Sequence, residues 1–125
     1  MDLLQPLEWN RRFQLWYYSV GHSQLLLRAN PVTEQDERIE VLFKSVDWIS
    51  VPTVFSGLRV AHIGDGDSAA ALVKHGAAGA ALSPRARMFR VHAGAVEGLV
   101  VAAAVFSRSD RLDYAAPSPW DLPTL

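Results

Sequence analysis

Cysteine is missing from this chain of 125 residues, and an excess of charge of either sign is missing as well. Without thiols the chain can hold neither a disulfide framework nor a thiolate metal site, and a reducing cytoplasm is its expected compartment. The 12 Lys and Arg side chains are balanced by 13 Asp and Glu side chains, which gives a formal net charge of −1. Nucleic acids and anionic lipids attract concentrated basic charge, so we expect neither as a general partner.

Long apolar runs are also lacking. The longest, residues 99–106, is too short to cross a membrane as a helix, and the first ten residues lack the basic start and apolar core of a secretory signal. Hydrophobic residues make up 50% of the chain and charged residues 20%, which is the balance of a folded protein. We expect one domain over 1–125, with residues 1–12 as a lead-in and residues 112–125 as an irregular, proline-rich tail.

The aromatic stretch at 13–28 is the feature around which the rest of the chain is interpreted. Residues 13–20 are rich in aromatic side chains and residues 24–28 in leucine, which predicts two strands joined by the turn Gly21-His22-Ser23. Gly21 is the residue expected to take a positive φ. Alternation places Tyr17 on one face of the first strand, and Trp16 and Tyr18 on the other.

Further strands are predicted over residues 39–48, 58–63, 88–92 and 99–106. The apolar phase slips by one residue after Lys44, which indicates a β-bulge or a bend between two strands. Residues 68–75 favour a short helix that Asp67 caps and Gly76 ends, whereas residues 77–83 fit either helix or strand. These runs predict a mainly β fold, an antiparallel sandwich or a strongly curved sheet with one short α-helix.

Catalytic and metal-binding patterns are not evident. The four histidines show no spacing typical of compact zinc sites, and the GDGD sequence at 64–67 lacks the other ligands of a calcium loop. No serine lies in a glycine-flanked nucleophile elbow. We therefore expect no catalytic residues, no metal and no cofactor, and enzymatic activity is the less favoured interpretation.

A group of arginines is the one local charge feature. Arg85, Arg87 and Arg90 would lie near Arg108 and Arg111 if the last two predicted strands form a hairpin about residues 94–98. Such a patch could hold an acidic partner or nucleic acid. The simpler interpretation is solvated arginine, partly neutralised by neighbouring aspartates.

A resemblance extends over roughly the first half of the chain. The aromatic strand and turn at 16–24, LLLR at 25–28, RIEVLFKSV at 38–46 and GLRV at 57–60 together resemble small uncharacterised bacterial β-rich proteins. They are also loosely similar to immunity proteins that neutralise toxins. The resemblance implies a protein that acts by binding another protein and has no catalytic residues.

Two functions follow as hypotheses. The first is a non-enzymatic interaction module that contacts another protein or a second copy of itself, because tryptophan, tyrosine and arginine are enriched at interface hot spots. Its expected contact residues are Trp16, Tyr18, His22, Arg28 and Trp48. The second is a small-molecule-binding or catalytic domain with a pocket between the sheet and the short helix. Its expected lining is Trp16, Tyr18, His22, His62 and His92.

Overall fold

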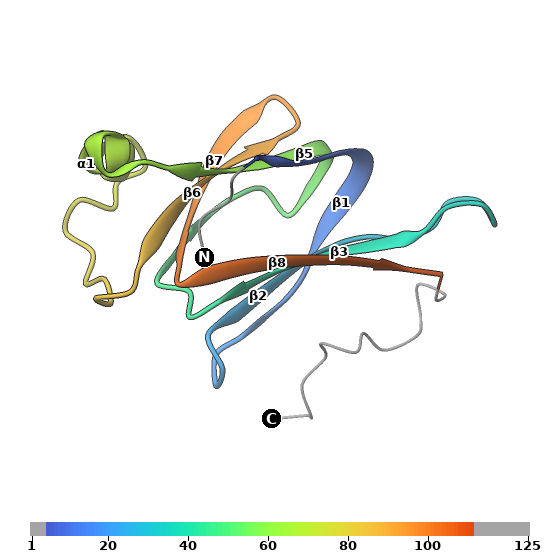
Figure 1. Ribbon diagram of the computed structural model, residues 1–125, viewed down its shortest axis with the longest axis horizontal. Coiled ribbons are helices and arrows are strands. Elements are labelled where there is room, and N and C mark those ends of the chain that lie inside the picture. The colour runs from blue at the N-terminus through green and yellow to red at the C-terminus, as the bar shows by residue number, and fades with distance from the viewer. Residues whose placement is uncertain (1–4, 112–125) are drawn as a thin grey trace.

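Residues 5–111 are described by the computed structural model, and they form one antiparallel sheet with one short helix (Figure 1). The predicted class, mainly β with a strongly curved sheet and one helix, is confirmed. The strands follow one another in the sheet as β4-β7-β6-β5-β1-β2-β3-β8. In chain order the elements are β1 (Leu7–Ser19), β2 (Gln24–Ala29), β3 (Arg38–Lys44), β4 (Trp48–Ser50), β5 (Val54–Ile63), α1 (Asp65–Lys74), β6 (Arg87–Ala93), β7 (Val96–Ala102) and β8 (Ala104–Asp110).

The sheet bends sharply where two chain segments pass from one half to the other. Strand β3 continues into β4 through three residues, and β7 continues into β8 through Ala103 alone. The two segments are bonded at this corner, since the Asp47 amide donates to the Val101 carbonyl at 2.8 Å and the Ala103 amide donates to the Lys44 carbonyl at 2.9 Å. Ser45 has a φ of 55° there. The bend predicted after Lys44 is therefore confirmed.

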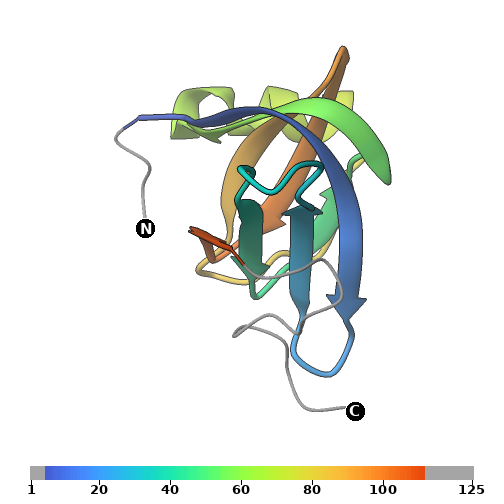
Figure 2. The same cartoon turned by 90° about the vertical axis from the view of Figure 1, so that its right-hand side faces the viewer.

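The main apolar core lies on the concave face of the bent sheet. Every second residue of the paired strands points inward, and Phe43 of β3 contacts Phe89 of β6 across the core with ring centroids 5.9 Å apart. Strand β1 runs along both halves, because its first part pairs with β5 and its last part with β2 (Figure 2). The fully buried members include Phe13, Leu25, Leu27, Val41, Phe43, Val60, Phe89, Val91 and Val100.

A second, smaller apolar cluster covers part of the convex face. Ile63, Leu99 and Val101 are buried there beneath α1 and the segment that follows it. The helix contributes Ala71 and Leu72, while Lys74 forms an ion pair with Glu97 of β7 at 2.5 Å. No residue of α1 is buried, so the helix rests on the sheet through a narrow apolar contact and this ion pair.

Several element boundaries differ from those expected. Strand β1 begins at Leu7, inside the expected lead-in, because Leu7 pairs with Val60 of β5. The helix begins at Asp65, with Gly64 as its N-cap, and ends before Gly76, whose φ is +73°. Residues 77–83, for which helix and strand were both open, form neither. The single strand expected over 99–106 is broken at Ala103 by the corner, and the expected proline-rich tail lies outside the described residues.

The alternation expected along the aromatic strand is interrupted. A bulge lies between Leu15 and Tyr17 in the pairing of β1 with β2. As a result Tyr17 lies opposite Leu26, whereas Tyr18 lies opposite Leu25, whose side chain belongs to the core. The expected grouping of Tyr18 with Trp16 on one face therefore fails. In the turn, Ser23 and not Gly21 takes the positive φ, at 51°.

Five charged residues form a network on the convex face of β2, β3 and β8. Two nitrogens of Arg28 donate to one oxygen of Glu40 at 2.6 and 2.9 Å, and Arg108 donates to the other oxygen at 3.0 Å. Asp110 accepts from Arg38 at 3.0 Å and from Arg108 at 2.6 Å. Arg28, Arg38 and Glu40 are at most 1% exposed. The network joins three adjacent strands with side chains that lie directly opposite one another.

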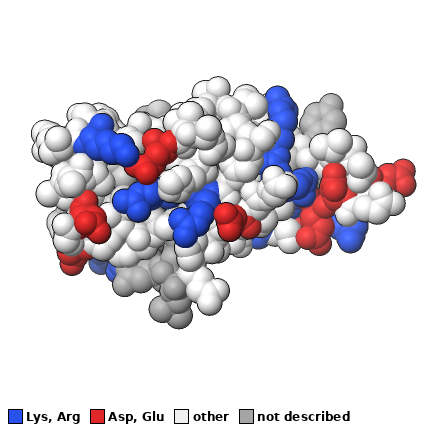
Figure 3. All heavy atoms as spheres, turned by 90° about the horizontal axis from the view of Figure 1, so that it is seen from above, with Lys and Arg blue, Asp and Glu red and all other residues white. Residues whose placement is uncertain are grey.

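Opposite charges are interspersed on the outside of the molecule as well. The face drawn in Figure 3 carries Lys and Arg side chains beside Asp and Glu side chains, and neither sign dominates it. This distribution agrees with the net charge of −1. Among residues 5–111 no helix is long and apolar enough to cross a membrane.

Replacing Glu40 with glutamine tests the buried network. The substitution keeps the shape of the side chain but leaves Arg28 and Arg108 without their shared carboxylate, so we expect the free energy of unfolding to fall by about 3–5 kcal/mol. Urea denaturation followed by tryptophan fluorescence measures this loss. Glu37→Gln removes an exposed carboxylate from the same segment and serves as the control. Equal stability of the two variants would contradict the network's role.

The ion pair that anchors α1 predicts a pH dependence. The hydrogen bond from Lys74 lowers the pKa of Glu97 below its ordinary value of 4.5. The stability contributed by this pair is therefore present above that ordinary value and is lost as pH falls through the lowered pKa. In Lys74→Met, NMR titration should find the pKa of Glu97 raised toward 4.5. Lys44→Met, which removes the other lysine, should leave it unchanged.

Candidate functional site

A cavity lies where β5 ends, α1 begins and the corner strand β8 starts. Its volume is about 1060 Å³. We call it the α1 cavity and define it by the residues that line it: His62, Ile63, Gly64, Asp65, Ser68, Pro84, Arg85, Ala86, Arg87, Met88, Ala103 and Ala104. Small-ligand pockets usually have volumes of a few hundred to about 1,000 Å³. The α1 cavity therefore has room for a metabolite-sized molecule.

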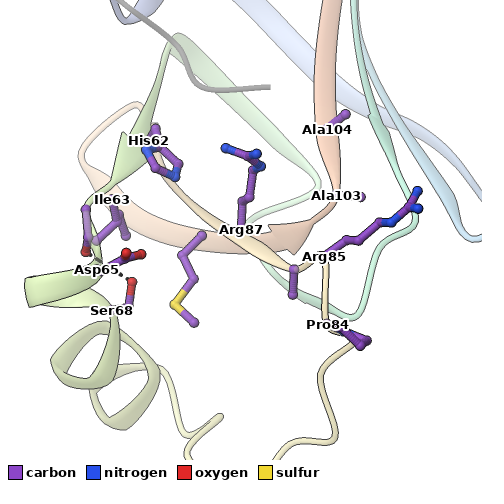
Figure 4. A pocket seen from close by; sticks show the side chains of 12 residues that line it. His62, Ile63, Asp65, Ser68, Pro84, Arg85, Arg87, Ala103 and Ala104 are labelled. Carbon is purple, nitrogen blue, oxygen red and sulfur yellow. Dashed lines mark hydrogen bonds between the residues drawn. The ribbon is translucent and has the colours of Figure 1, made fainter.

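One side of the α1 cavity is basic. Arg87 is the first residue of β6 and is half-buried, while Arg85 is exposed two residues earlier. His62 lies near the end of β5 and packs against Phe89, with ring centroids 5.8 Å apart. In Figure 4 the side chains of His62 and Arg87 lie on the same side of their strands, away from α1, and Arg85 extends away from both. The pairing of β5 with β6 places His62 opposite Phe89, two residues after Arg87.

The side formed by α1 is acidic and rich in oxygen atoms. Asp65 is the first residue of the helix, a position at which the positive end of the helix dipole favours a carboxylate. The Ser68 hydroxyl donates to the Gly64 carbonyl at 3.1 Å. Because its proton is used in this bond, the oxygen of Ser68 faces other groups as an acceptor.

Apolar side chains form the surface between these two sides. Met88 and Ile63 lie opposite each other in the pairing of β6 with β5. Ala103 and Ala104 lie at the corner of the sheet, where their small side chains leave space.

The residue types of a serine-hydrolase triad are present in this cavity, but their arrangement differs from one. A triad needs the serine hydroxyl to donate to the histidine. Here the Ser68 hydroxyl donates to a backbone carbonyl in the first turn of α1. The Ser68 hydroxyl is therefore not placed as the nucleophile of a triad would be.

A smaller cavity of about 210 Å³ lies between α1 and the convex face of β6 and β7. Lys74, Arg90 and Glu97 line it, and Glu97 pairs with both cations, at 2.5 Å with Lys74 and 3.7 Å with Arg90. His75 lies nearby with its Nδ1 atom 3.5 Å from the Ser50 hydroxyl. These charges already compensate one another, so the small cavity is a structural contact between helix and sheet.

The five expected contact residues lie in three different places. Trp16 and Arg28 are together, with the guanidinium carbon 4.3 Å from the ring centroid. Tyr18 is 39% exposed at the end of the same strand, and His22 lies exposed in the following turn. Trp48 belongs to β4 and packs against the second apolar cluster. None of the five lines the α1 cavity.

The residues expected around a pocket are only partly those observed. Of the set Trp16, Tyr18, His22, His62 and His92, the α1 cavity includes His62. His92 lies opposite Glu97 on the convex face of β6 and β7. The α1 cavity lies at the ends of β5 and β6 beside the first turn of α1.

The expected arginine patch divides into separate groups. Strand β8 pairs with β3 and not with β6, so Arg108 belongs to the Glu40 network. Arg85 and Arg87 line the α1 cavity, and Arg90 lines the smaller one. The hairpin about Gly94 forms between β6 and β7. It therefore leaves Arg108 on another part of the molecule.

Sequence patterns gave weak signals for the cavity. Asp65 and Ser68 have the sequence positions of ordinary helix-start residues, and nothing in the chain links them to Arg85 and Arg87 some 20 residues later. Residues 5–111 contain no group of three or more His, Asp and Glu side chains that could hold a metal ion. Comparison of the chain with protein families, curated proteins and solved structures found no match.

Proposed function

We propose that this protein is a small-molecule-binding domain and that the α1 cavity is its binding site. One observation carries the proposal: side chains from the end of β5, the start of β6 and the first turn of α1 line one cavity, among them His62, Arg87 and Asp65. Binding pockets typically combine an apolar surface with a few converging polar groups. Ile63, Met88 and the two corner alanines supply that surface.

Binding without chemistry is the form of the function that the contacts support. The Ser68 hydroxyl is engaged with the backbone of its own helix, so it is poorly placed as a nucleophile. The arginines remain positively charged at any physiological pH and orient ligands better than they exchange protons. The domain therefore selects and holds a ligand.

Narrowing the cavity at Gly64 tests the proposal. A Cβ atom added at Gly64 would meet no atom within 4 Å, and the same holds for a Cβ atom added at Gly66, two residues later. Either position can therefore accept a larger side chain. We expect Gly64→Phe to weaken ligand binding at least tenfold, because Gly64 lines the cavity. A thermal-shift screen of the unmodified protein against a defined set of metabolites supplies the ligands, and calorimetry measures their affinities.

Gly66→Phe is the matched control, since Gly66 lies in the same helix but lines neither cavity. Its affinities should equal those of the unmodified protein. If ligands bind both variants equally, or if NMR shifts caused by ligands lie outside the α1 cavity, the proposed site is wrong.

Contact between two copies of the chain is a second candidate function. It is supported by the position of Trp16, which is 36% exposed and is held over the buried Arg28 guanidinium. An aromatic side chain fixed in place loses little conformational entropy on binding, and tryptophan is frequent at interface hot spots. Self-association through the convex side of β1 would use this residue.

Replacing Trp16 with alanine tests the second function. We expect the unmodified protein to form dimers at micromolar concentration, and we expect the substitution to raise the dimer dissociation constant about 30-fold, a typical hot-spot loss. Sedimentation equilibrium measures both. Val73→Ala removes an exposed apolar side chain from α1 and is the control. A monomeric unmodified protein would contradict self-association.

A further inference from the structure

We propose that the C-terminal segment, residues 112–125, covers the convex face of β2, β3 and β8. This contact is separate from the α1 cavity and is made within a single chain. Two buried leucines, Leu26 and Leu42, carry the proposal, because the helix and strands of residues 5–111 leave their side of the sheet uncovered.

Both leucines point to the convex side of the sheet. Leu26 is next to Leu25 and Leu42 is next to Phe43, and the side chains of Leu25 and Phe43 belong to the core on the concave side. Successive side chains of a strand point to opposite faces, so Leu26 and Leu42 face outward. They lie opposite each other in the pairing of β2 with β3, and Leu42 also lies opposite Phe106 of β8. An apolar row therefore crosses three adjacent strands.

The burial of this row requires another layer above it. Leu26 is 0% exposed and Leu42 is 1% exposed, although neither belongs to the main core or to the second apolar cluster. Neighbouring strands screen a side chain from the sides, whereas water reaches it from above unless a further layer covers the sheet. A segment of the same chain must therefore lie over the two leucines.

The helix does not supply that layer. α1 packs against Ile63 and Val101 in the other half of the sheet, and Figure 1 shows it away from β2 and β3. The connection between β2 and β3, residues 30–37, is mostly exposed. The start of β1 also lies in the other half, where Leu7 pairs with Val60. Within residues 5–111, no helix is placed to cover the convex face of β2, β3 and β8.

The C-terminal segment starts beside this face and is long enough to cross it. β8 is an edge strand, and its last residue, Asp110, belongs to the Glu40 network on the same convex face. An extended segment of residues 112–125 would span about 45 Å, since each residue adds ~3.3 Å. The three spacings from β8 to β1 add to about 14 Å. The segment can therefore pass over β8, β3 and β2.

The segment has the composition of a cover and not of a further strand. Its large apolar side chains are Leu112, Tyr114, Trp120, Leu122 and Leu125. Pro117, Pro119 and Pro123 lack a backbone donor, which prevents continuous pairing along the outer edge of β8. The segment also contains two aspartates and no lysine or arginine. Its charge is complementary in sign to the Glu40 network, in which three arginines accompany two carboxylates.

A spin label on the C-terminal segment tests the contact in the full chain. Because the chain has no cysteine, Ser118→Cys supplies a single attachment site for a nitroxide. We expect the methyl NMR signals of Leu26 and Leu42 to lose most of their intensity relative to the sample with a reduced, diamagnetic label. The methyl signals of Leu72 and Val101, which lie at the second apolar cluster in the other half, should keep their intensity.

A control label and a mixed sample identify the chain that makes the contact. Val96→Cys places the nitroxide at the exposed start of β7 and should leave the signals of Leu26 and Leu42 unchanged. In the mixed sample, Ser118→Cys chains carry the nitroxide and other chains carry the isotope. Loss of the Leu26 and Leu42 signals there would assign the cover to a second copy and overturn the proposal. Full intensity in the Ser118→Cys sample itself would also overturn it.

A second measurement detects the cover without a label on the segment. A soluble gadolinium chelate speeds the relaxation of methyl groups that solvent can reach. Replacing both Trp120 and Leu122 with serine should raise this relaxation several-fold at Leu26 and Leu42, because the apolar contacts that hold the cover are lost. Val32→Ser, at an exposed position between β2 and β3, should leave it unchanged. Equal relaxation in the double variant and the unmodified chain would contradict the contact.

Discussion

The corner at which two chain segments cross decides most of this structure. Strands β3 and β8 lie in one half of the sheet, whereas β4 and β7, which are their neighbours along the chain, lie in the other half. Backbone hydrogen bonds near Lys44 and Ala103 hold the two connecting segments together. Because the chain turns there, the concave face closes over one apolar core. Because of this corner, β8 pairs with β3, and the small residues Ala103 and Ala104 lie beside the α1 cavity. Fold and candidate site thus depend on the same bend.

Arginine serves two different purposes in this protein. In the Glu40 network, three arginines are compensated by two carboxylates, and two of those arginines are at most 1% exposed. Burial of charge is tolerable there because each guanidinium has a partner with good geometry. At the α1 cavity, Arg85 and Arg87 are at least partly accessible to solvent. Both line that cavity together with Asp65 from the start of α1.

Local patterns predicted much of the fold because the relevant physics is local. Aromatic and β-branched alternation identified the strands, and the phase slip after Lys44 identified one side of the corner. The position of β1's start at Leu7 was missed because pairing with β5, and not local preference, makes those residues a strand. The bulge at Trp16 was missed for the same reason. One extra residue there changes which neighbour each following side chain meets.

The candidate site was less accessible to sequence reasoning than the fold. His62 was among the residues expected around a pocket, whereas the presence of Arg85, Arg87, Asp65 and Ser68 in the lining of one cavity was not foreseen. Those residues are separated along the chain, and only the approach of β6 to β5 and of α1 to the sheet end unites them.

The sequence by itself determined the mainly β class, the single helix, the absence of thiol chemistry and the near-neutral charge, since composition and short-range periodicity control these properties. Only the tertiary structure decided which arginines became buried partners of Glu40 and which came to line the cavity. The reason is that strand order, which fixes side-chain neighbours across the sheet, depends on long-range pairing energies that no local segment contains.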